Sequence, residues 1–498
     1  MTSIVPTRHA GGRRRGLCGL HAHRRRHEAL DMASDEGSAQ LEEVSPDEIC
    51  RLVHERYSRL AKTGKPQVGE WTVLAGVVLT DRHGARVVSL GTGTKCLTMA
   101  QIAADGGGES LHDAHAEVCA RRALLTFLLA EIQLAASSDD ASSQVLQARG
   151  DGGSRDAVAF ELRPEVGLHF YSSEVPCGDA AIIALPPTPS QTSAPEPAAK
   201  RLKMTGARPA EASALAAEAA TYGAACEFGL VRTKPGRGGR TSCMSCSDKL
   251  VRWQALGVQG ALLSHLLPAP IRFASITLGR TDGLESLSRA LRRGGAAAPC
   301  TAGGAQRLAA DAAAARAMPP PQPTLWATSR RFEHAAPPAE EASSLRPCSN
   351  SVLWSAAGLC EAINGMSGKR LGANKRAPSP KHRSAVCKAL LMQTFMEVVR
   401  SLPPARLPPC LRVLVGFTEG TLSSESTGSM DGSSAVVVAL PADYAELKAL
   451  AEPYQLAKAA MMREPPFSDW VRAPRSCEAF ALCCGRQAAE QVCETASA

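Results

Sequence analysis

The stretch that decides the fold is Leu-His-Asp-Ala-His-Ala-Glu at residues 111–117, which runs directly into the apolar segment Val-Cys-Ala-Arg-Arg-Ala-Leu-Leu-Thr-Phe-Leu-Leu-Ala-Glu-Ile at 118–132. The spacing of the apolar residues predicts an amphipathic helix over about 115–132. His115 and Glu117 lie at its start, two residues apart. A His-x-Glu pair on a helix is by itself more typical of a solvated surface, so its meaning depends on the rest of the chain.

Strand and helix patterns alternate around this helix. Runs rich in β-branched and aromatic residues predict strands at 71–79, 166–171 and 271–278, and a further helix is expected within 243–280. Strand and helix patterns return in 350–400 and 442–472. The alternation predicts a single α/β domain.

Low-complexity segments interrupt this domain. Stretches rich in Pro, Ala, Ser, Asp or Gly occupy about 136–158, 186–224, 292–347 and 418–434, and they lack a periodic apolar face. We expect them to be disordered loop insertions in a domain that spans 46–480, since loop closure costs little more for a long loop than for a short one. We expect the basic segment 1–45 to be disordered and 481–498 to form a tail.

The composition limits the class of protein. The chain has 498 residues, a net charge of +8 and 44% apolar residues, which is enough for a large core and fits a polyanionic partner. No apolar run is long enough to cross a membrane, and no protein partner is implied. The 17 scattered cysteines fit a reducing compartment, so we expect a nuclear or cytoplasmic protein. The Arg-rich first 31 residues could instead be an organellar address or an RNA-binding arm, and Met32 could be the true start.

Further motifs supply metal ligands. Pro-Cys-Gly-Asp lies at 176–179, Arg-Thr-Lys at 232–234 and Ser-Cys-Ser-Asp-Lys at 245–249. A catalytic zinc site needs three protein ligands and one open position. His115 and Cys177 supply two ligands. Small zinc deaminases carry the next cysteine three residues after the first, but Ala180 stands there, so the third ligand must be distant: Cys243 or Cys246.

The chemistry of such a site assigns a role to Glu117. Zinc lowers the pKa of water enough to give a nucleophile at neutral pH. In zinc nucleobase deaminases a glutamate that does not ligate the metal moves the proton from water to the ring and on to the leaving ammonia. Glu117 is therefore the candidate catalytic residue. A structural zinc site is disfavoured, because no fourth cysteine or histidine is obviously placed.

Taken together, these motifs resemble the editase domain that adenosine deaminases acting on RNA and on tRNA share. The resemblance covers most of 70–475 and is carried by His-Ala-Glu-Val at 115–118, Pro-Cys-Gly-Asp-Ala at 176–180, Met-Ser-Cys-Ser-Asp-Lys at 244–249, and matches that end at Trp470-Val471. It implies a cytidine-deaminase-like mixed sheet flanked by helices, expanded by C-terminal helices around a buried inositol hexakisphosphate. It also implies that Cys246 is the third zinc ligand and Cys243 a bystander.

The inositol hexakisphosphate would need a set of permanent cations, because buried phosphates without partners are prohibitively costly. The resemblance assigns this role to basic residues at matching positions: Arg121, Arg122, Lys249, Arg252, Lys369, Lys448 and Lys458. Tyr444, Tyr454 and Trp470 also match and could donate hydrogen bonds. Ala473 replaces a lysine of the family, which would remove one contact.

Two segments bear on the substrate. The resemblance assigns substrate contacts to Thr94 and Lys95, within Gly-Thr-Gly-Thr-Lys-Cys at 91–96, and to Lys234. Residues 232–243 match a loop that carries a base-expelling glutamate in editors of double-stranded RNA, yet they contain no acidic residue. Arg237 and Arg240 in this loop suit phosphate contacts, and an anticodon-loop base is already unpaired.

We therefore expect a zinc-dependent enzyme that deaminates adenosine to inosine in tRNA. The resemblance points to the adenosine immediately 3′ of the anticodon, position 37, of alanine tRNA. The alternatives are an editor of double-stranded RNA, which would add binding domains for which 1–45 is too short, and an inactive RNA-binding relative. A cytidine deaminase would carry its second cysteine close to the first.

Overall fold

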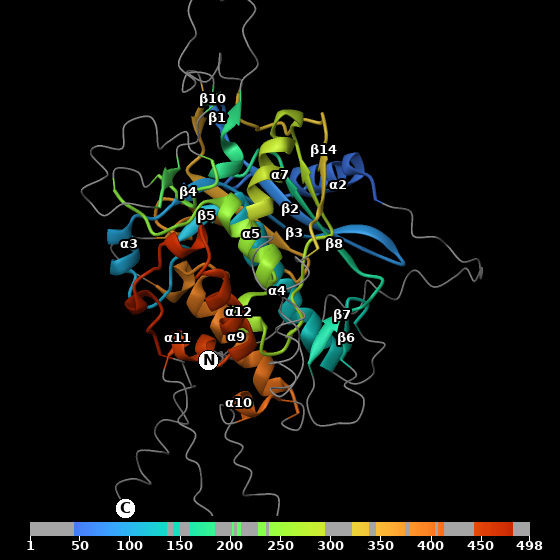
Figure 1. Ribbon diagram of the computed structural model, residues 1–498, viewed down its shortest axis with the longest axis vertical. Coiled ribbons are helices and arrows are strands. Elements are labelled where there is room, and N and C mark those ends of the chain that lie inside the picture. The colour runs from blue at the N-terminus through green and yellow to red at the C-terminus, as the bar shows by residue number, and fades with distance from the viewer. Residues whose placement is uncertain are drawn as a thin grey trace, which may run out of the picture. The chain divides into compact units, whose positions relative to one another are not determined.

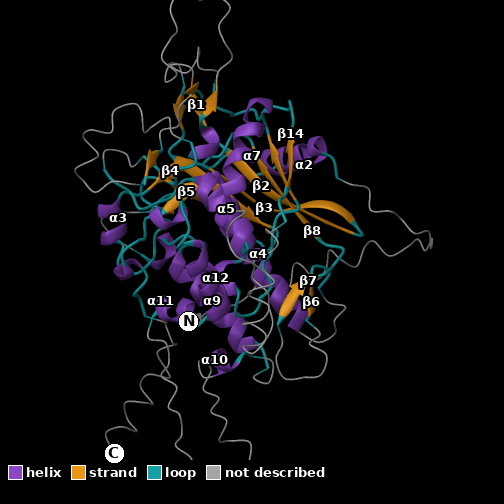
Figure 2. Ribbon diagram, in the orientation of Figure 1, coloured by secondary structure: helices purple, strands orange, loops and turns teal. Residues whose placement is uncertain are grey.

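The computed structural model describes residues 44–136, 143–149, 159–184, 202–203, 207–210, 228–235, 239–293, 321–337, 345–373, 379–403, 407–412 and 443–481. All of them belong to one compact unit, 43–498. Figures 1 and 2 show helices packed around a central sheet. The predicted mixed α/β architecture is thereby confirmed.

The central sheet has the strand order β14-β13-β8-β2-β3-β16-β17-β18. Strands β8, β13 and β14 are parallel to one another, and the other neighbours are antiparallel. The strands are β2 (Leu74–Asp81), β3 (Gly84–Thr92), β8 (Gly167–Ser172), β13 (Ser275–Leu278), β14 (Thr324–Ala327), β16 (Asn350–Ser355), β17 (Cys360–Asn364) and β18 (Lys369–Arg370).

Short strands form pairs outside this sheet. They are β1 (Glu70–Trp71) with β15 (Arg346–Pro347), β4 (Thr94–Cys96) with β5 (Asp113–His115), β6 (Leu146–Ala148) with β7 (Phe160–Leu162), β9 (Ile183–Ala184) with β10 (Leu202–Lys203), and β11 (Arg208–Pro209) with β12 (Arg232–Thr233). The pair β4–β5 leads directly into the helix predicted from the 111–132 stretch.

Strand β2 is buried on both faces. Ala75, Val77 and Leu79 pack into the larger core, on the side of helix α4 (Ala116–Ala136). Leu74 and Val78 face the opposite way, toward helix α2 (Pro46–Ser58). Because successive side chains of a strand alternate between faces, one apolar strand supplies both cores.

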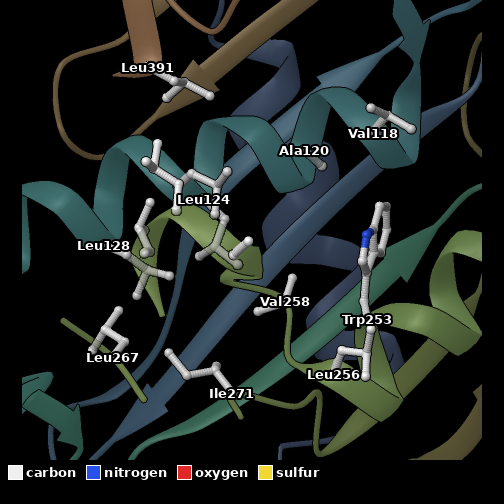
Figure 3. Packing of buried hydrophobic residues seen from close by; sticks show 14 of the residues in the cluster. Val118, Ala120, Leu124, Leu128, Trp253, Leu256, Val258, Leu267, Ile271 and Leu391 are labelled. Atoms are coloured by element: carbon white, nitrogen blue, oxygen red, sulfur yellow. The ribbon is translucent and has the colours of Figure 1, made fainter. Parts of the chain in front are cut away.

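Helix α4 crosses the sheet and anchors the larger core. Leu124 and Leu128 belong to the same buried cluster as Val258, Leu267 and Ile271, and Figure 3 shows these side chains facing one another. The other helices are α3 (Met99–Ala104), α5 (Cys246–Leu256), α6 (Gly260–Leu263) and α7 (Leu284–Arg292). The helix predicted over 115–132 is confirmed and extends to Ala136.

The C-terminal part adds a helical layer. It consists of α9 (Lys388–Ser401), α10 (Pro409–Arg412), α11 (Tyr444–Ala449) and α12 (Glu452–Met461). Helix α9 packs on α4 and α6, and α12 packs on α5 and α6. Asp443 begins α11 by accepting the backbone N–H of Glu446 at 2.8 Å, a standard N-cap.

Three expectations about the elements need correction. The strand expected over 271–278 begins only at Ser275: Ile271 and Phe273 are buried in the core, but they belong to no strand. Segment 292–347, expected to be disordered, contains β14 of the central sheet, held by parallel pairing to β13. Segments 136–158 and 186–224 contain β6, β10 and β11. Residues 1–43, the 418–434 insertion and the tail after residue 481 lie outside the described residues.

Among the described residues, no helix combines the length and the apolar character needed to span a membrane.

Candidate active site

Three elements meet at the metal-site motifs. His115 is the last residue of β5, immediately before α4. Cys177 lies in the loop between β8 and the 3₁₀ turn Asp179–Ala181. Cys246 is the first residue of α5, so strand ends and helix starts converge here.

The geometry of the three side chains fits a tetrahedral metal. His115 Nδ1 lies 3.8 Å from Cys177 Sγ and 3.7 Å from Cys246 Sγ. The three donor atoms all lie within 4.8 Å of one another. A tetrahedral zinc with ordinary bond lengths would separate a nitrogen and a sulfur ligand by about 3.6 Å. The donor set and its spacing therefore suit zinc.

Cys243, the other candidate for the third ligand, lies elsewhere. It belongs to a small buried cluster with Cys96 and Ile102. Its sulfur contacts the carbonyl oxygen of His112 at 3.7 Å. Cys246, in contrast, joins His115 and Cys177.

Local backbone geometry holds the two cysteine loops together. The backbone N–H of Ser247 donates to the carbonyl oxygen of Cys177 at 3.0 Å, and the N–H of Cys246 approaches Cys177 Sγ at 3.4 Å. Gly178 has φ +107, and a Cβ there would lie 2.1 Å from Ser245 Oγ. Only glycine allows so close an approach.

Glu117 is buried in the first turn of α4, with 3% of its surface exposed. Its Oε2 has no hydrogen-bond partner among the described residues. Burial raises the pKa of this carboxyl, and the neighbouring Cys177 adds to the effect. A buried carboxylate without a partner is costly, so its retention beside a metal-binding set is typical of a functional group.

An ion-pair network lies beside the site. Lys234 Nζ donates to both carboxylate oxygens of Asp113, at 2.9 and 2.7 Å, and Lys249 also donates to Asp113. Burial alone would lower the pKa of Lys234, but Asp113 and the cysteines raise it well above its ordinary value. Lys234 is 2% exposed, and its ammonium is hydrogen-bonded to Asp113. The substrate contact expected of Lys234 stays a prediction.

The other two residues expected at the substrate lie next to the metal-site strand. Thr94 pairs with His115, and Lys95 with Ala114, across β4 and β5. Gly93, which precedes them, has φ +133, and a Cβ there would lie 2.1 Å from the carbonyl oxygen of Ala114. Thr94 and Lys95 therefore lie beside the strand that carries His115, and their contact with the substrate stays a prediction.

A second charged site lies between α4, α5 and the C-terminal helices. We call it the basic cluster; it contains Arg121, Arg122, Arg252, Lys388, Lys448 and Lys458, with Tyr444, Tyr454 and Trp470. Arg252 donates to the Tyr454 hydroxyl at 3.3 Å. Within the described part of the chain, Lys388 and Lys448 form ion pairs with Glu478, and the other cations of the cluster form none.

The electrostatics of the basic cluster fit a polyanion. Burial, together with the neighbouring arginines, lowers the pKa of Arg121 to about 10. Burial, Arg252 and Lys448 likewise lower the pKa of Lys458. Burial would raise the pKa of Tyr454, but Arg252 and Arg121 bring it below its ordinary value. A bound anion would relieve such an excess of partly buried positive charge.

Two of the lysines assigned to the inositol hexakisphosphate, Lys369 and Lys249, have their ammonium groups beside carboxylates outside the basic cluster. Lys369 is on β18 with its Nζ 3.6 Å from Glu109, at a surface pocket that Arg370 and His382 also line. Lys249 shares one face of α5 with Arg252, but its ammonium binds Asp113.

Sequence reasoning missed two functional candidates. Asp113 lies inside the quoted 111–117 stretch, two residues before His115, but its partners Lys234 and Lys249 are distant in the chain. Lys388 joins the basic cluster through Glu478 at 3.1 Å. The sequence signal for Lys388 is Val-Cys-Lys at 386–388, a further stretch that resembles the editase domain.

Comparison with known proteins agrees with this geometry. The model of the adenosine-deaminase (editase) domain matches residues 89–474. The chain is 32% identical over 372 residues to tRNA-specific adenosine deaminase 1 of Drosophila melanogaster, covering 72% of this chain and 82% of the relative. It is 28% identical over 532 residues to the Mus musculus protein of the same name, covering 86% and 98%. The double-stranded RNA-specific editase Adar of Drosophila melanogaster is 31% identical over 267 residues, covering 53% and 37%. This chain therefore belongs to the adenosine-deaminase (editase) domain family.

Proposed function

We propose that this adenosine deaminase hydrolyses adenosine to inosine in a tRNA, with a zinc ion held by His115, Cys177 and Cys246. The observation that carries the proposal is the spacing of these three donor atoms beside the buried carboxylate of Glu117, whose Oε2 has no hydrogen-bond partner among the described residues. Within the described residues the set offers three protein ligands, the number that catalytic zinc sites use.

When bound, zinc would supply the Lewis acidity that makes water a nucleophile near neutral pH. Glu117 accepts a proton from the water that attacks C6 of adenine and delivers it to N1 of the ring. It then carries the second proton of the water to the departing amino group, so that ammonia leaves and inosine remains. Its position two residues after His115, at the start of a rigid helix, keeps this carboxylate beside the metal ligands.

Lys234 has a supporting role in this proposal. It is buried beside the thiol groups, and its charge favours the thiolate form of Cys177. Asp113 holds the ammonium through two hydrogen bonds, so Lys234 contributes a fixed positive charge instead of a ligand atom. Thr94 and Lys95, on the strand paired with His115, are proposed to contact the substrate nucleotide.

The tRNA substrate rests on the relatives. This chain covers 82% and 98% of two tRNA-specific relatives, but 37% of the double-stranded RNA editase. The loop 232–243 carries Arg240, which is exposed, and no acidic residue that could expel a paired base. We propose the adenosine at position 37, next to the anticodon of alanine tRNA, and a nuclear or cytoplasmic location.

We propose that the basic cluster binds inositol hexakisphosphate. Each phosphate would take its charge-assisted hydrogen bonds from arginine and lysine side chains that otherwise crowd together. Burial and the neighbouring cations lower the pKa values of Arg121 and Lys458, which reflects that crowding. The ligand would serve as part of the core, since α4, α5 and α12 all supply residues to the cluster.

Incubation with RNA tests the function. Purified protein is mixed with transcribed alanine tRNA, with its isolated anticodon stem-loop and with a long RNA duplex, and inosine is read as guanosine after reverse transcription. We expect inosine at position 37 of the intact tRNA and none with the Glu117→Gln variant. Editing of the duplex without editing of the tRNA would favour the double-stranded RNA alternative.

A further inference from the structure

Both cysteines of the metal site are followed two residues later by an aspartate. Asp179 follows Cys177 and Asp248 follows Cys246, and both aspartates are completely buried. One side chain reaches both: Arg293, the C-cap residue directly after α7, donates to Asp248 Oδ1 at 2.8 Å and lies 3.8 Å from Asp179 Oδ2.

Asp248 fixes the start of the helix that carries Cys246. Its Oδ2 accepts the Ser245 hydroxyl at 2.6 Å and the backbone N–H of Arg232 at 2.8 Å. Ser245 is the N-cap of α5, directly before Cys246. Any displacement of Asp248 therefore moves the first turn of α5 and the Cys246 thiol with it.

Asp179 fixes the loop that carries Cys177. Its Oδ1 accepts the backbone N–H of Gly229 at 2.7 Å, and its backbone carbonyl accepts Arg289 Nη2 at 2.8 Å. Arg293 also reaches this region, since its Nη1 donates to the carbonyl oxygen of Leu230 at 2.9 Å. The Arg293 guanidinium thus contacts the aspartates that support both cysteine loops.

We propose that Arg293 is a positioning residue that sets the separation of Cys177 and Cys246. Two buried carboxylates would repel each other and push the loops apart, and the planar guanidinium of Arg293 lies within ion-pair distance of both. Arg289 lies 3.6 Å from Asp179 Oδ2 but makes no ion pair with Asp248, so Arg293 is the cation that couples the two aspartates. Partners of this kind, outside the ligands themselves, orient metal ligands and tune affinity. The inference rests on the metal site proposed above and extends it to α7, a helix that supplies no ligand.

Metal binding by the purified full-length chain tests the role. The affinity for zinc is measured by chelator competition, and the thiolate-to-metal and ligand-field bands are recorded with cobalt(II). We expect Arg293→Gln to weaken zinc binding about 10- to 100-fold and to alter the cobalt spectrum. Arg293→Lys should recover part of the affinity for zinc, because lysine keeps the positive charge but lacks the planar set of N–H donors of a guanidinium. Arg292→Ala, on the same helix but exposed, is the matched control and should behave as wild type.

Further variants keep the test decisive. If Arg293→Gln is insoluble, Asp179→Asn and Asp248→Asn replace it, and weaker metal binding by both supports the coupling of the two loops. Wild-type affinity and spectrum in Arg293→Gln, or in either aspartate variant, would overturn it. If the wild-type chain itself fails to bind one zinc ion, the proposed metal site is wrong, and so is the role of Arg293. That result differs from normal zinc binding by both the wild type and Arg293→Gln, which contradicts only the role of Arg293.

Discussion

Lys234 and Asp113 form a buried ion pair in which Nζ donates to both carboxylate oxygens, at 2.9 and 2.7 Å. The two residues are 2% and 5% exposed. The pair joins the loop before α5 to the strand that ends at His115, and so links two sides of the metal site.

This ion pair leads to a prediction for the variant that lacks the Lys234 ammonium. Lys234→Met should destabilise the fold by up to about 3–5 kcal/mol, because Asp113 loses one of its two lysines inside the protein. It should also weaken metal binding, since the charge that favours the Cys177 thiolate is lost. Urea unfolding and metal analysis measure both effects. Lys95→Met, at a more exposed position, is the control; equal stability of the two variants would contradict the prediction.

The identity of the third ligand gives a second prediction. Cys246→Ala should remove zinc and all activity, because only two ligands remain. Cys243→Ala should leave both largely intact, since Cys243 packs with Cys96 in a different cluster. Metal analysis of the two purified variants decides the matter. Zinc loss from the Cys243 variant alone would reverse the assignment.

A third prediction concerns proton transfer. Glu117→Gln should keep zinc and fold but slow deamination by at least about 10²- to 10⁴-fold, the usual worth of general acid–base catalysis. The isosteric amide preserves packing, so the thermal unfolding temperature should change little. Glu131→Gln is the control: it lies on the same helix, and its carboxylate accepts the Ser143 hydroxyl at 2.7 Å, away from the metal site. Near-normal turnover by Glu117→Gln would remove its proton-shuttle role.

The basic cluster supplies a fourth prediction. Arg252→Ala or Lys458→Ala should give insoluble or poorly expressed protein, because unpaired buried phosphate costs roughly 3–5 kcal/mol. Lys369→Ala should be tolerated, since this lysine pairs with Glu109 at the surface pocket. Soluble yield and the inositol hexakisphosphate content of the purified protein are the measurements. Soluble, active protein from cells that cannot make the ligand would show that the cluster does not need it.

The last prediction is a pH dependence of stability. Burial lowers the pKa of His169 from 6.5 to about 4, and its ring contacts the hydroxyls of Ser275 at 2.8 Å and Thr80 at 3.1 Å. Between these two pKa values the unfolded chain binds a proton that the folded chain does not. The contribution of His169 is therefore full above pH 6.5 and is lost as the pH falls toward 4.

Urea midpoints between pH 7 and pH 4 test this dependence. His169→Gln cannot be protonated in this range, so its stability should decline less steeply than that of the wild type, even if it begins lower. His83→Gln, at an exposed position of the β2–β3 turn, should follow the wild-type curve. Parallel curves for the His169 variant and the wild type would contradict the assignment.

The sequence by itself determined much of this protein. The apolar spacing of 118–132 was enough to predict α4, because a helix that must bury one face repeats that face every three to four residues. The short motifs were enough to nominate His115, Glu117 and Cys177, because deaminase chemistry demands those groups at those spacings.

Only the tertiary structure decided which distant residues meet. It paired Lys234 with Asp113 and placed Arg293 between Asp179 and Asp248. It also recovered β14 from a segment that reads as low complexity, because pairing with β13 stabilises a strand whose own pattern is weak. Burial and partner choice depend on how the chain packs, and local spacing in a sequence does not encode either of them.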